Sequence, residues 1–196
     1  MSLKTSVIIL AAGASSRLGR PKQLLTYKGR SLLWHAIHEA CISRADEVLV
    51  ILGANHDLMV NEIPHDKKIK FILNDHWKEG MASSIKAGIE FIQQISMPDC
   101  LILAVCDQPF LDSALFNGLI DKHVKTNKPI VACQYEQTLG TPVLFSKQYF
   151  GHLISLKGEQ GAKSILRQHE NEVATITFPF GHIDIDTNEQ YKALLA

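Results

Sequence analysis

The sequence of 196 residues has no net charge, because 20 lysines and arginines balance 20 aspartates and glutamates. A chain without excess positive charge creates no overall field that would gather nucleic acid or an anionic membrane surface. Long apolar runs are missing as well: none reaches the roughly 18 residues of a membrane-spanning helix, and Val7–Ala12 is too short for a signal peptide. We therefore expect a cytoplasmic protein with neither nucleic-acid nor membrane partners, in which any anion is bound at a local site.

Cysteine is scarce, and its pattern excludes the usual metal and redox motifs. Cys41, Cys100, Cys106 and Cys133 form no C-x-x-C pair and no metal-binding spacing with a histidine, so we expect reduced and mostly buried thiols. Hydrophobic residues make up 46% of the chain and charged residues 20%, which is a globular rather than a disordered composition. The length suits one domain, residues 1–196.

Short apolar runs alternate with helical patterns through residue 133. The runs are nearly continuous in apolar residues, which is typical of strands covered on both faces, and comprise Val7–Leu10, Val48–Leu52, Ile69–Leu73, Cys100–Cys106 and Ile130–Cys133. Between them a helical stripe recurs over Ser31–Ser43, Ser83–Ile95 and Asp112–Val124, with Ser31 and Asp112 as N-caps. This alternation predicts a Rossmann-like α/β fold with a mostly parallel sheet and helices on both faces.

The regular alternation of apolar runs and helical patterns ends after residue 134. We expect strands over Pro142–Phe145, Val173–Phe178 and Ile183–Ile185, a helix over Gly161–Glu170 and a terminal helix after Asn188. No repeat, low-complexity tract or long linker is present. This later part therefore continues the same domain, and we expect it to contribute to a site.

The stretch Ile9–Leu25 reads ILAAGASSRLGRPKQLL and joins a strand end to small and basic residues. A parallel strand delivers such a loop to the carboxyl edge of the sheet, where open α/β proteins bind ligands. Gly13 and its small neighbours let backbone N–H groups converge on an anion, while Arg17 and Lys22 add positive charge. Neither the Walker pattern nor G-x-G-x-x-G is present. The loop predicts a polyphosphate cradle; the alternative is a solvated basic turn.

The pattern L-A-A-G-x-S-x-R-x-G-x-P-K in this loop resembles the signature of nucleotidyltransferases with a glycosyltransferase-A-type fold. More narrowly, it is similar to that of the molybdenum cofactor nucleotidyltransferases. Further segments resemble the family in the same order along the chain: Asn74–Gly88, Cys106–Leu111, Gly140–Phe145, Leu156–Leu166 and Asp184–Tyr191. Because these segments cover most of the chain, chance similarity of one loop does not explain them.

The resemblance implies a nucleotide site around the first loop. Arg17 and the Gly13 loop would hold the β- and γ-phosphates, while Lys22 would stabilise charge that develops on the α-phosphate and the leaving group. The implied nucleotide-binding residues are Leu10, Ala11, Ala12, Gly13, Arg17, Lys22, Gly80 and Ser84. Gly80 and Ser84 open a predicted helix, where capping by Ser83 or Ser84 is the alternative explanation.

Aspartates supply the candidate ligands of Mg²⁺. Asp107 ends an apolar strand, where a carboxylate is well placed to hold the ion together with phosphate oxygens and water. Asp184 and Asp186 alternate with isoleucine, so a strand would place both carboxylates on one face. The resemblance implies that Mg²⁺ binds Asp107 and Asp186, and that Arg17, Lys22 and Asp107 are catalytic. For Asp184, metal binding and helix capping both remain open.

The resemblance also implies an acceptor site, formed by Gly140, Pro142, Gly158, Gly161 and Lys163. Glycines and lysines ahead of a helix suit an anion, although a loop beside a solvated helix face explains the same pattern. The family usually has Asp and Arg where this chain has Glu159 and Lys163. Lysine lacks the bidentate fork of arginine, which weakens the expected grip on an acceptor phosphate.

These residues together predict an enzyme that transfers CMP from CTP to the phosphate of molybdenum-bound molybdopterin and releases pyrophosphate. CTP is favoured because L-A-A-G resembles cytidylyl-transferring members, whereas guanylyl-transferring members tend to have L-A-G-G; a methyl group at Ala12 would crowd a purine. The alternatives are GMP transfer to the same cofactor, a sugar- or alditol-phosphate nucleotidyltransferase, and a non-catalytic chaperone that binds nucleotide or cofactor. A nicotinamide-dependent dehydrogenase is disfavoured by its missing fingerprint. Molybdoenzyme maturation proteins are further candidate partners.

Overall fold

A seven-stranded sheet forms the centre of the computed structural model, which describes residues 3–195. Its strands are β1 (Thr5–Leu10), β4 (Glu47–Leu52), β5 (Ile69–Leu73), β6 (Cys100–Val105), β7 (Ile130–Tyr135), β8 (Thr138–Ser146) and β9 (Val173–Thr177). They follow the order β5-β4-β1-β6-β8-β7-β9. All neighbours pair in parallel except β8, which runs antiparallel to both β6 and β7. The predicted mostly parallel sheet is thus confirmed.

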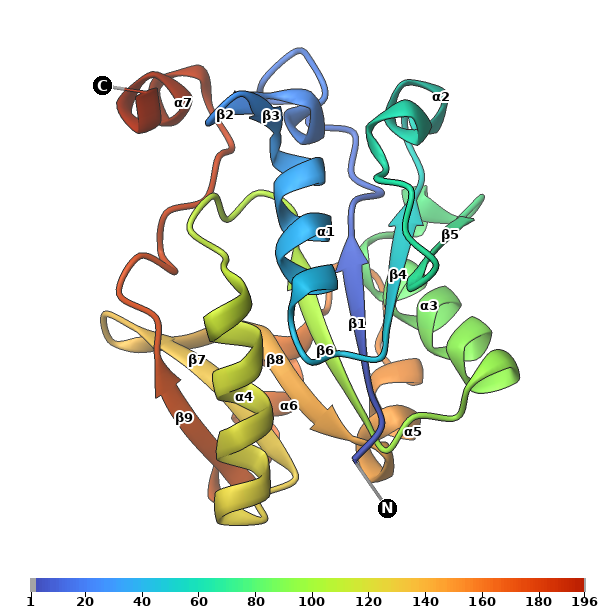
Figure 1. Cartoon of the computed structure of the whole chain (residues 1–196), viewed down its shortest axis with the longest axis vertical. Coiled ribbons are helices and arrows are strands. Elements are labelled where there is room, and N and C mark those ends of the chain that lie inside the picture. The colour runs from blue at the N-terminus through green and yellow to red at the C-terminus, as the bar shows by residue number, and fades with distance from the viewer. Residues whose placement is uncertain (1–2, 196) are drawn as a thin grey trace.

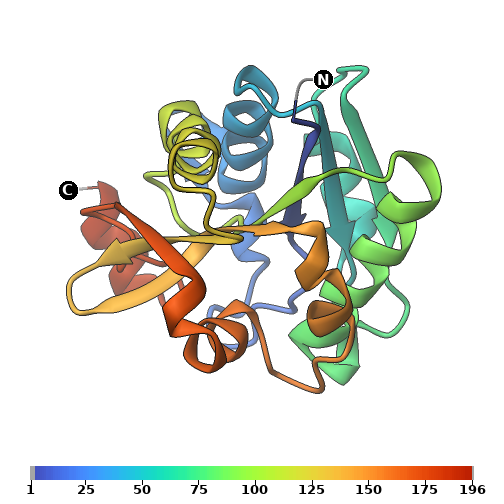
Figure 2. The same cartoon turned by 90° about the horizontal axis from the view of Figure 1, so that it is seen from below.

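Helices cover both faces of this sheet (Figure 1). Figure 2 shows α1 (Leu32–Ile42) and α4 (Ser113–Thr126) on one face, with α3 (Met81–Ile95), α5 (Phe150–Ile154) and α6 (Ala162–Gln168) on the other. Alternation within β1 explains the two layers: Val7 and Ile9 belong to the apolar cluster of α1 and α4, and Ile8 to that of α3. Each such side chain contributes about 1.5–3 kcal/mol when fully buried. A nearly continuous apolar strand is therefore stabilised from both sides.

Shorter elements complete the chain: α2 (His56–Met59), α7 (Asn188–Leu195), the hairpin strands β2 (Thr26–Tyr27) and β3 (Arg30–Ser31), and the 3-10 helices η1 (Lys22–Leu24), η2 (Val60–Glu62), η3 (Trp77–Glu79), η4 (Lys147–Tyr149) and η5 (Glu170–Glu172). Both expected N-caps are confirmed. The Ser31 hydroxyl accepts from the backbone N–H of Trp34 at 3.1 Å, and the Asp112 carboxylate accepts from that of Leu115 at 2.7 Å. A cap of this kind stabilises a helix by about 1 kcal/mol.

The segment Ile183–Ile185 is not a strand, so this part of the prediction is wrong. Ile185 is fully buried in a small apolar cluster with Leu18 and Leu25, and its backbone N–H donates to the carbonyl oxygen of Asp107 at 3.1 Å. An apolar anchor and isolated backbone hydrogen bonds, rather than a ladder, therefore decide its position. The segment still reaches the carboxyl end of β6.

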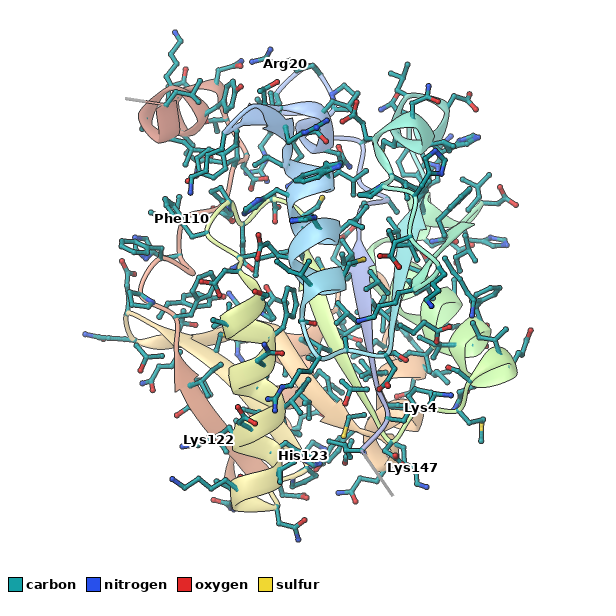
Figure 3. All side chains as sticks on the ribbon, viewed as in Figure 1. Lys4, Arg20, Phe110, Lys122, His123 and Lys147 are labelled. Atoms are coloured by element: carbon teal, nitrogen blue, oxygen red, sulfur yellow. The ribbon has the colours of Figure 1, made fainter. Side chains whose placement is uncertain are left out.

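The loops that follow β1 and β6 lie at one end of the molecule. Figure 3 shows Arg20 and Phe110 at this end, whereas Lys4 and Lys147 lie toward the opposite end. The Arg20 guanidinium lies 5.4 Å from the ring centre of Tyr191 on α7. It therefore attaches the loop to the C-terminal helix, in keeping with a cation–π contact.

The range 3–195 contains no helix that is long and apolar enough to cross a membrane. All four cysteines are free, as expected; Cys41 is partly exposed and the other three are buried. Burial, reinforced by the neighbouring Asp107 carboxylate, raises the pKa of the Cys106 thiol to about 12. Cys106 therefore stays protonated beside the site and is unsuited to act as a nucleophile.

Candidate active site

A buried glutamine fixes the loop that follows β1. Gln23 is 1% exposed, and its side-chain amide donates to the carbonyl oxygens of Ala11 at 2.9 Å and Gly13 at 2.8 Å. Its amide oxygen accepts from the hydroxyl of Ser15 at 3.2 Å, and that hydroxyl accepts from the backbone N–H of Lys22 at 3.0 Å. The loop is thus tied at both ends to one side chain. Sequence reasoning did not single out Gln23, although it directly follows Lys22 in the stretch Ile9–Leu25.

We expect Gln23→Ala to destabilise the protein by about 2–3 kcal/mol, because two backbone carbonyl groups lose their partners inside the protein. For a chain of this length the melting temperature should fall by roughly 5–10 °C. The KM for the nucleotide should rise as the loop loosens. Thermal unfolding beside Gln168→Ala, an exposed glutamine on α6, measures the effect. Equal melting temperatures for the two variants would show that Gln23 does not hold the loop.

Four charged side chains form a cluster where β1 and β6 end; Arg17, Lys22, Asp107 and Asp186 are called the charged centre below. The Lys22 ammonium lies between two carboxylates, 2.5 Å from Asp107 Oδ2 and 2.8 Å from Asp186 Oδ1. The Arg17 guanidinium contacts Asp186 Oδ2 at 2.6 Å. Side-chain exposure falls from 70% for Arg17 to 19% for Lys22, so solvent screens the Lys22 pairs less. The structure therefore brings together every residue that we expected to be catalytic or to bind the metal.

The contacts within the charged centre shift pKa values in opposite directions. Burial disfavours the Lys22 ammonium, but the Asp107 and Asp186 carboxylates more than offset this and raise the pKa of Lys22. Burial likewise disfavours the Asp186 carboxylate, yet Lys22 and then Arg17 hold its pKa below the ordinary value of 3.8. Partial burial, followed by the charges of Asp107 and Asp186, raises the pKa of Asp184. Lys22 is consequently charged and Asp186 ionised around neutral pH, as electrostatic catalysis requires.

A cavity of about 300 Å³ opens beside Lys22, between the end of the sheet and α3. Most of the expected nucleotide-binding residues line it: Leu10, Ala11, Ala12, Gly13, Lys22, Gly80 and Ser84. Trp77 and Met81 add apolar surface to the wall. The volume lies at the lower end of the range of about 300–1,000 Å³ for small-ligand pockets. Arg17 lines an adjacent cavity instead.

The start of α3 faces this first cavity and is arranged differently from a serine-capped helix. The N-cap is Gly80, and no side chain caps the helix. The side-chain amide of Asn74 donates to the hydroxyl oxygens of Ser83 at 2.9 Å and Ser84 at 3.0 Å. The Ser83 hydroxyl in turn donates to the carbonyl oxygen of Gly80 at 2.9 Å. The capping explanation is therefore wrong for both serines, and Ser84 is a buried hydroxyl held at the cavity wall.

A second, larger cavity of about 720 Å³ adjoins the first. Five residues line both cavities: Lys22, Met81, Val105, Asp107 and Glu159. The second is also lined by Arg17, Gly161, Lys163, Asp184 and Asp186. Two ligand-sized spaces thus meet at the charged centre, and groups bound in them would come together beside Lys22 and Asp107.

Gly140, Pro142 and Gly158 were expected to bind the acceptor, but none of the three is among the residues 3–195 that line the first or the second cavity. They lie behind the lining residues and support them. Pro142 is buried in β8. The carbonyl oxygen of Gly158 accepts from the backbone N–H of Ala82 at 3.0 Å, which joins its loop to α3. A Cβ at Gly140 would lie 1.9 Å from the Tyr135 hydroxyl oxygen, so only glycine fits there. Direct contact between these residues and an acceptor stays a prediction.

Gln108 is a second buried glutamine that sequence reasoning did not single out. It is 4% exposed, and its amide donates to the carbonyl oxygens of Gly181 at 2.7 Å and Thr141 at 3.2 Å. These bonds connect the loop after β6 to β8 and to the segment that carries the C-terminal aspartates. Its position next to Asp107 in the segment Cys106–Leu111 is the signal that could have identified it.

The donor set of the charged centre fits a divalent cation. Asp107 Oδ1 is buried and has no hydrogen-bond partner among residues 3–195, a costly state for a carboxylate oxygen that a cation would relieve. The same range holds no group of three His, Cys, Asp or Glu side chains suited to a metal. Mg²⁺ needs only one or two protein carboxylates, because phosphate oxygens and water complete its octahedron. Asp107 and Asp186 therefore suit a divalent cation whose other ligands are phosphate oxygens and water.

A parallel sheet with a basic glycine-containing loop after its first strand and two aspartates at the same edge defines the class of nucleotidyltransferases with a Rossmann-like fold. The chain belongs to a specific family within this class, the MobA-like NTP transferase domain family, whose model matches residues 7–173.

Several proteins resemble the chain over nearly its whole length. It is 34% identical to the nicotine blue oxidoreductase of Paenarthrobacter nicotinovorans, over 96% of this chain and 95% of that protein. It is 25% identical to the purine catabolism protein PucB of Bacillus subtilis, over 94% and 92%. The crystal structure of Rv0371c from Mycobacterium tuberculosis has a TM-score of 0.85 at 26% identity, covering 100% of this chain and 99% of that one.

A further relative, matched over a shorter part of the chain, is named for molybdenum cofactor chemistry. The chain is 30% identical to a probable molybdenum cofactor guanylyltransferase of Halalkalibacterium halodurans, over 57% of this chain and 54% of that protein. The family expected from the sequence is thereby confirmed. These relatives are named for different activities, so they do not decide the nucleotide or the acceptor.

Proposed function

We propose that the protein transfers CMP from CTP to the phosphate of molybdenum-bound molybdopterin and releases pyrophosphate. The observation that carries the proposal is the position of Lys22, which lies between Asp107 and Asp186 where the two cavities meet. The first cavity would hold the nucleotide and the second the acceptor. An acceptor phosphate oxygen and the α-phosphorus would then approach each other at the charged centre, and most of the catalysis would come from positioning and charge.

Each residue of the charged centre has a defined task in this proposal. Backbone N–H groups near Gly13 and the Arg17 guanidinium would bind the β- and γ-phosphates, which replace Asp186 as the partner of Arg17. The Lys22 ammonium would move from the carboxylates to the α-phosphate and stabilise the charge that develops as pyrophosphate leaves. Asp107 and Asp186 would hold Mg²⁺, which when bound neutralises phosphate charge and orients the phosphates. No general base is needed, because an acceptor phosphate is already ionised near neutral pH.

The choice of CTP depends on the walls of the first cavity. Ala12 lines this cavity, and its methyl group would crowd a purine where the backbone passes the base. Trp77 offers an aromatic face, and the buried Ser84 hydroxyl a polar contact, for a pyrimidine. GMP transfer to the same cofactor and transfer to a sugar or alditol phosphate use the same charged centre and remain the alternatives, as does nucleotide or cofactor binding without transfer.

A relative named as an oxidoreductase raises one further alternative, hydride transfer. The glycine-rich dinucleotide fingerprint is missing from the loop after β1. Two carboxylates and two cations at the site would also serve a triphosphate better than a nicotinamide ring. Nucleotidyl transfer therefore accounts for the loop after β1 and for the charged centre better than hydride transfer does.

Thermal unfolding with CTP, GTP, ATP, UTP and NADH, each with and without Mg²⁺, tests the proposal. A ligand at about 100 times its Kd adds roughly 2.7 kcal/mol, which corresponds to a rise of about 5–10 °C for this length. We expect the largest rise with CTP, increased by Mg²⁺. A preference for GTP would favour guanylyl transfer, and a rise with NADH alone would contradict the proposal.

A further inference from the structure

Two cations lie on one face of α6, away from the charged centre. Lys163 and Arg167 are one helical turn apart, so their side chains project from the same side. Both line the second cavity, and both also line a third cavity of about 350 Å³ beside the β7–β8 turn. The pair therefore lies where the second cavity, taken as the acceptor space, adjoins the third.

Among residues 3–195, neither cation has a partner of opposite charge. No carboxylate of residues 3–195 lies within 4.0 Å of Lys163 or Arg167. Arg17 and Lys22, which line the same cavity, are both paired with aspartates. Of the lysines and arginines among residues 3–195 that line the second cavity, Lys163 and Arg167 are therefore the two without a carboxylate partner.

Lys163 is exposed, but the end of its side chain packs beside Gly140 at the wall of the second cavity. Its Cε lies 3.4 Å from the point where a Cβ would stand at Gly140, and the Tyr135 hydroxyl lies 1.9 Å from that point. Both side chains occupy the space that the missing Cβ leaves. Tyr135 is 7% exposed and lines the same cavity, so a rigid wall supports the lysine stem.

We propose that Lys163 and Arg167 bind a second anionic group of the acceptor, at the end remote from the phosphate that attacks. Arg167 supplies the bidentate fork that Lys163 lacks, and the two charges together match one carboxylate, phosphate or similar oxyanion. The acceptor class that fits is an elongated phosphomonoester with an anion at its far end. The inference rests on the proposed function only in taking the second cavity as the acceptor space.

Calorimetric titration with two probes of equal length tests this inference. 6-Phosphogluconate and glucitol 6-phosphate share six carbons and a phosphate, and differ in the terminal carboxylate. Each is titrated into the protein alone and into its complex with Mg²⁺ and a non-hydrolysable CTP analogue. We expect 6-phosphogluconate to bind roughly tenfold more tightly, the effect of one charge-assisted contact. Arg167→Gln and Lys163→Gln should each reduce this ratio toward one without changing the affinity for the analogue.

Lys125→Gln, an exposed lysine on α4, is the matched control and should keep the full ratio. Equal affinities for the two probes, no saturable binding of either, or an unchanged ratio in Arg167→Gln would overturn the inference. If the CTP analogue fails to bind, the proposed function is contradicted, while the ratio measured on the protein alone still decides the role of Lys163 and Arg167.

Discussion

Replacing Lys22 with alanine is expected to lower kcat by about 10²–10³ while the KM for the nucleotide changes only a few-fold. The loss corresponds to removing one preorganised group that stabilises developing charge, about 3–4 kcal/mol. In the structure the Lys22 side chain is 19% exposed and its ammonium is held by Asp107 and Asp186. It is therefore charged, and it already lies beside the place where the reacting phosphates would bind. In the proposed function, nucleotide affinity would depend more on Arg17 and the Gly13 loop.

Steady-state kinetics of Lys22→Ala beside Lys86→Ala measure this effect, because Lys86 is an exposed lysine on α3 that pairs with Glu90. The control should retain full activity. A Lys22→Ala variant whose kcat is unchanged and whose KM rises by the whole factor would show that Lys22 binds ground state and transition state equally. Its assigned role would then be wrong.

Gly80→Ala is expected to destabilise the protein by about 3 kcal/mol or more, because Gly80 has a φ of +101° and an added Cβ would lie 2.4 Å from the carbonyl oxygen of Gly158. The melting temperature should fall by roughly 6–12 °C. The clash is with backbone and cannot be relieved by a rotamer change. It would push the loop that carries Glu159 away from α3 and widen both cavities, so the KM should rise for nucleotide and acceptor alike.

Gly118→Ala is the control for a glycine-to-alanine change. Gly118 lies within α4, where an added Cβ would be 3.6 Å from Ile176, an ordinary contact. Removal of a helical glycine should leave stability unchanged or raise it by up to about 1 kcal/mol. If the two variants unfold at the same temperature, the close packing of Gly80 on Gly158 does not contribute to the site as described.

The main features of the fold follow from local sequence signals. Continuous apolar runs identify β1 and β4, and Ser31 and Asp112 mark helix starts, because burial on two faces and capping both act within a few residues. The same reasoning wrongly predicts a strand over Ile183–Ile185. The apolar alternation of this segment is real, but it serves a single anchor, Ile185, which packs against residues more than a hundred positions earlier.

The candidate site likewise contains residues that could be predicted from the sequence and residues that could not. Lys22, in the loop region after β1, and Asp107, just after β6, could be predicted because parallel strands deliver the loops that follow them to one edge of the sheet. The supporting side chains could not. Gln23 holds backbone carbonyl groups and Arg167 lines the second and third cavities, and neither placement follows from residue type or spacing alone.

The most direct test of nucleotidyl transfer follows the label of CTP carrying ³²P at the α or the γ position, in the presence of Mg²⁺ and molybdenum-bound molybdopterin. We expect the α label to appear in the cofactor and the γ label in pyrophosphate, in equal amounts, with Lys22→Ala slower by about 10²–10³. Label that remains in CTP, while GTP or NADH is consumed in its place, would contradict the account.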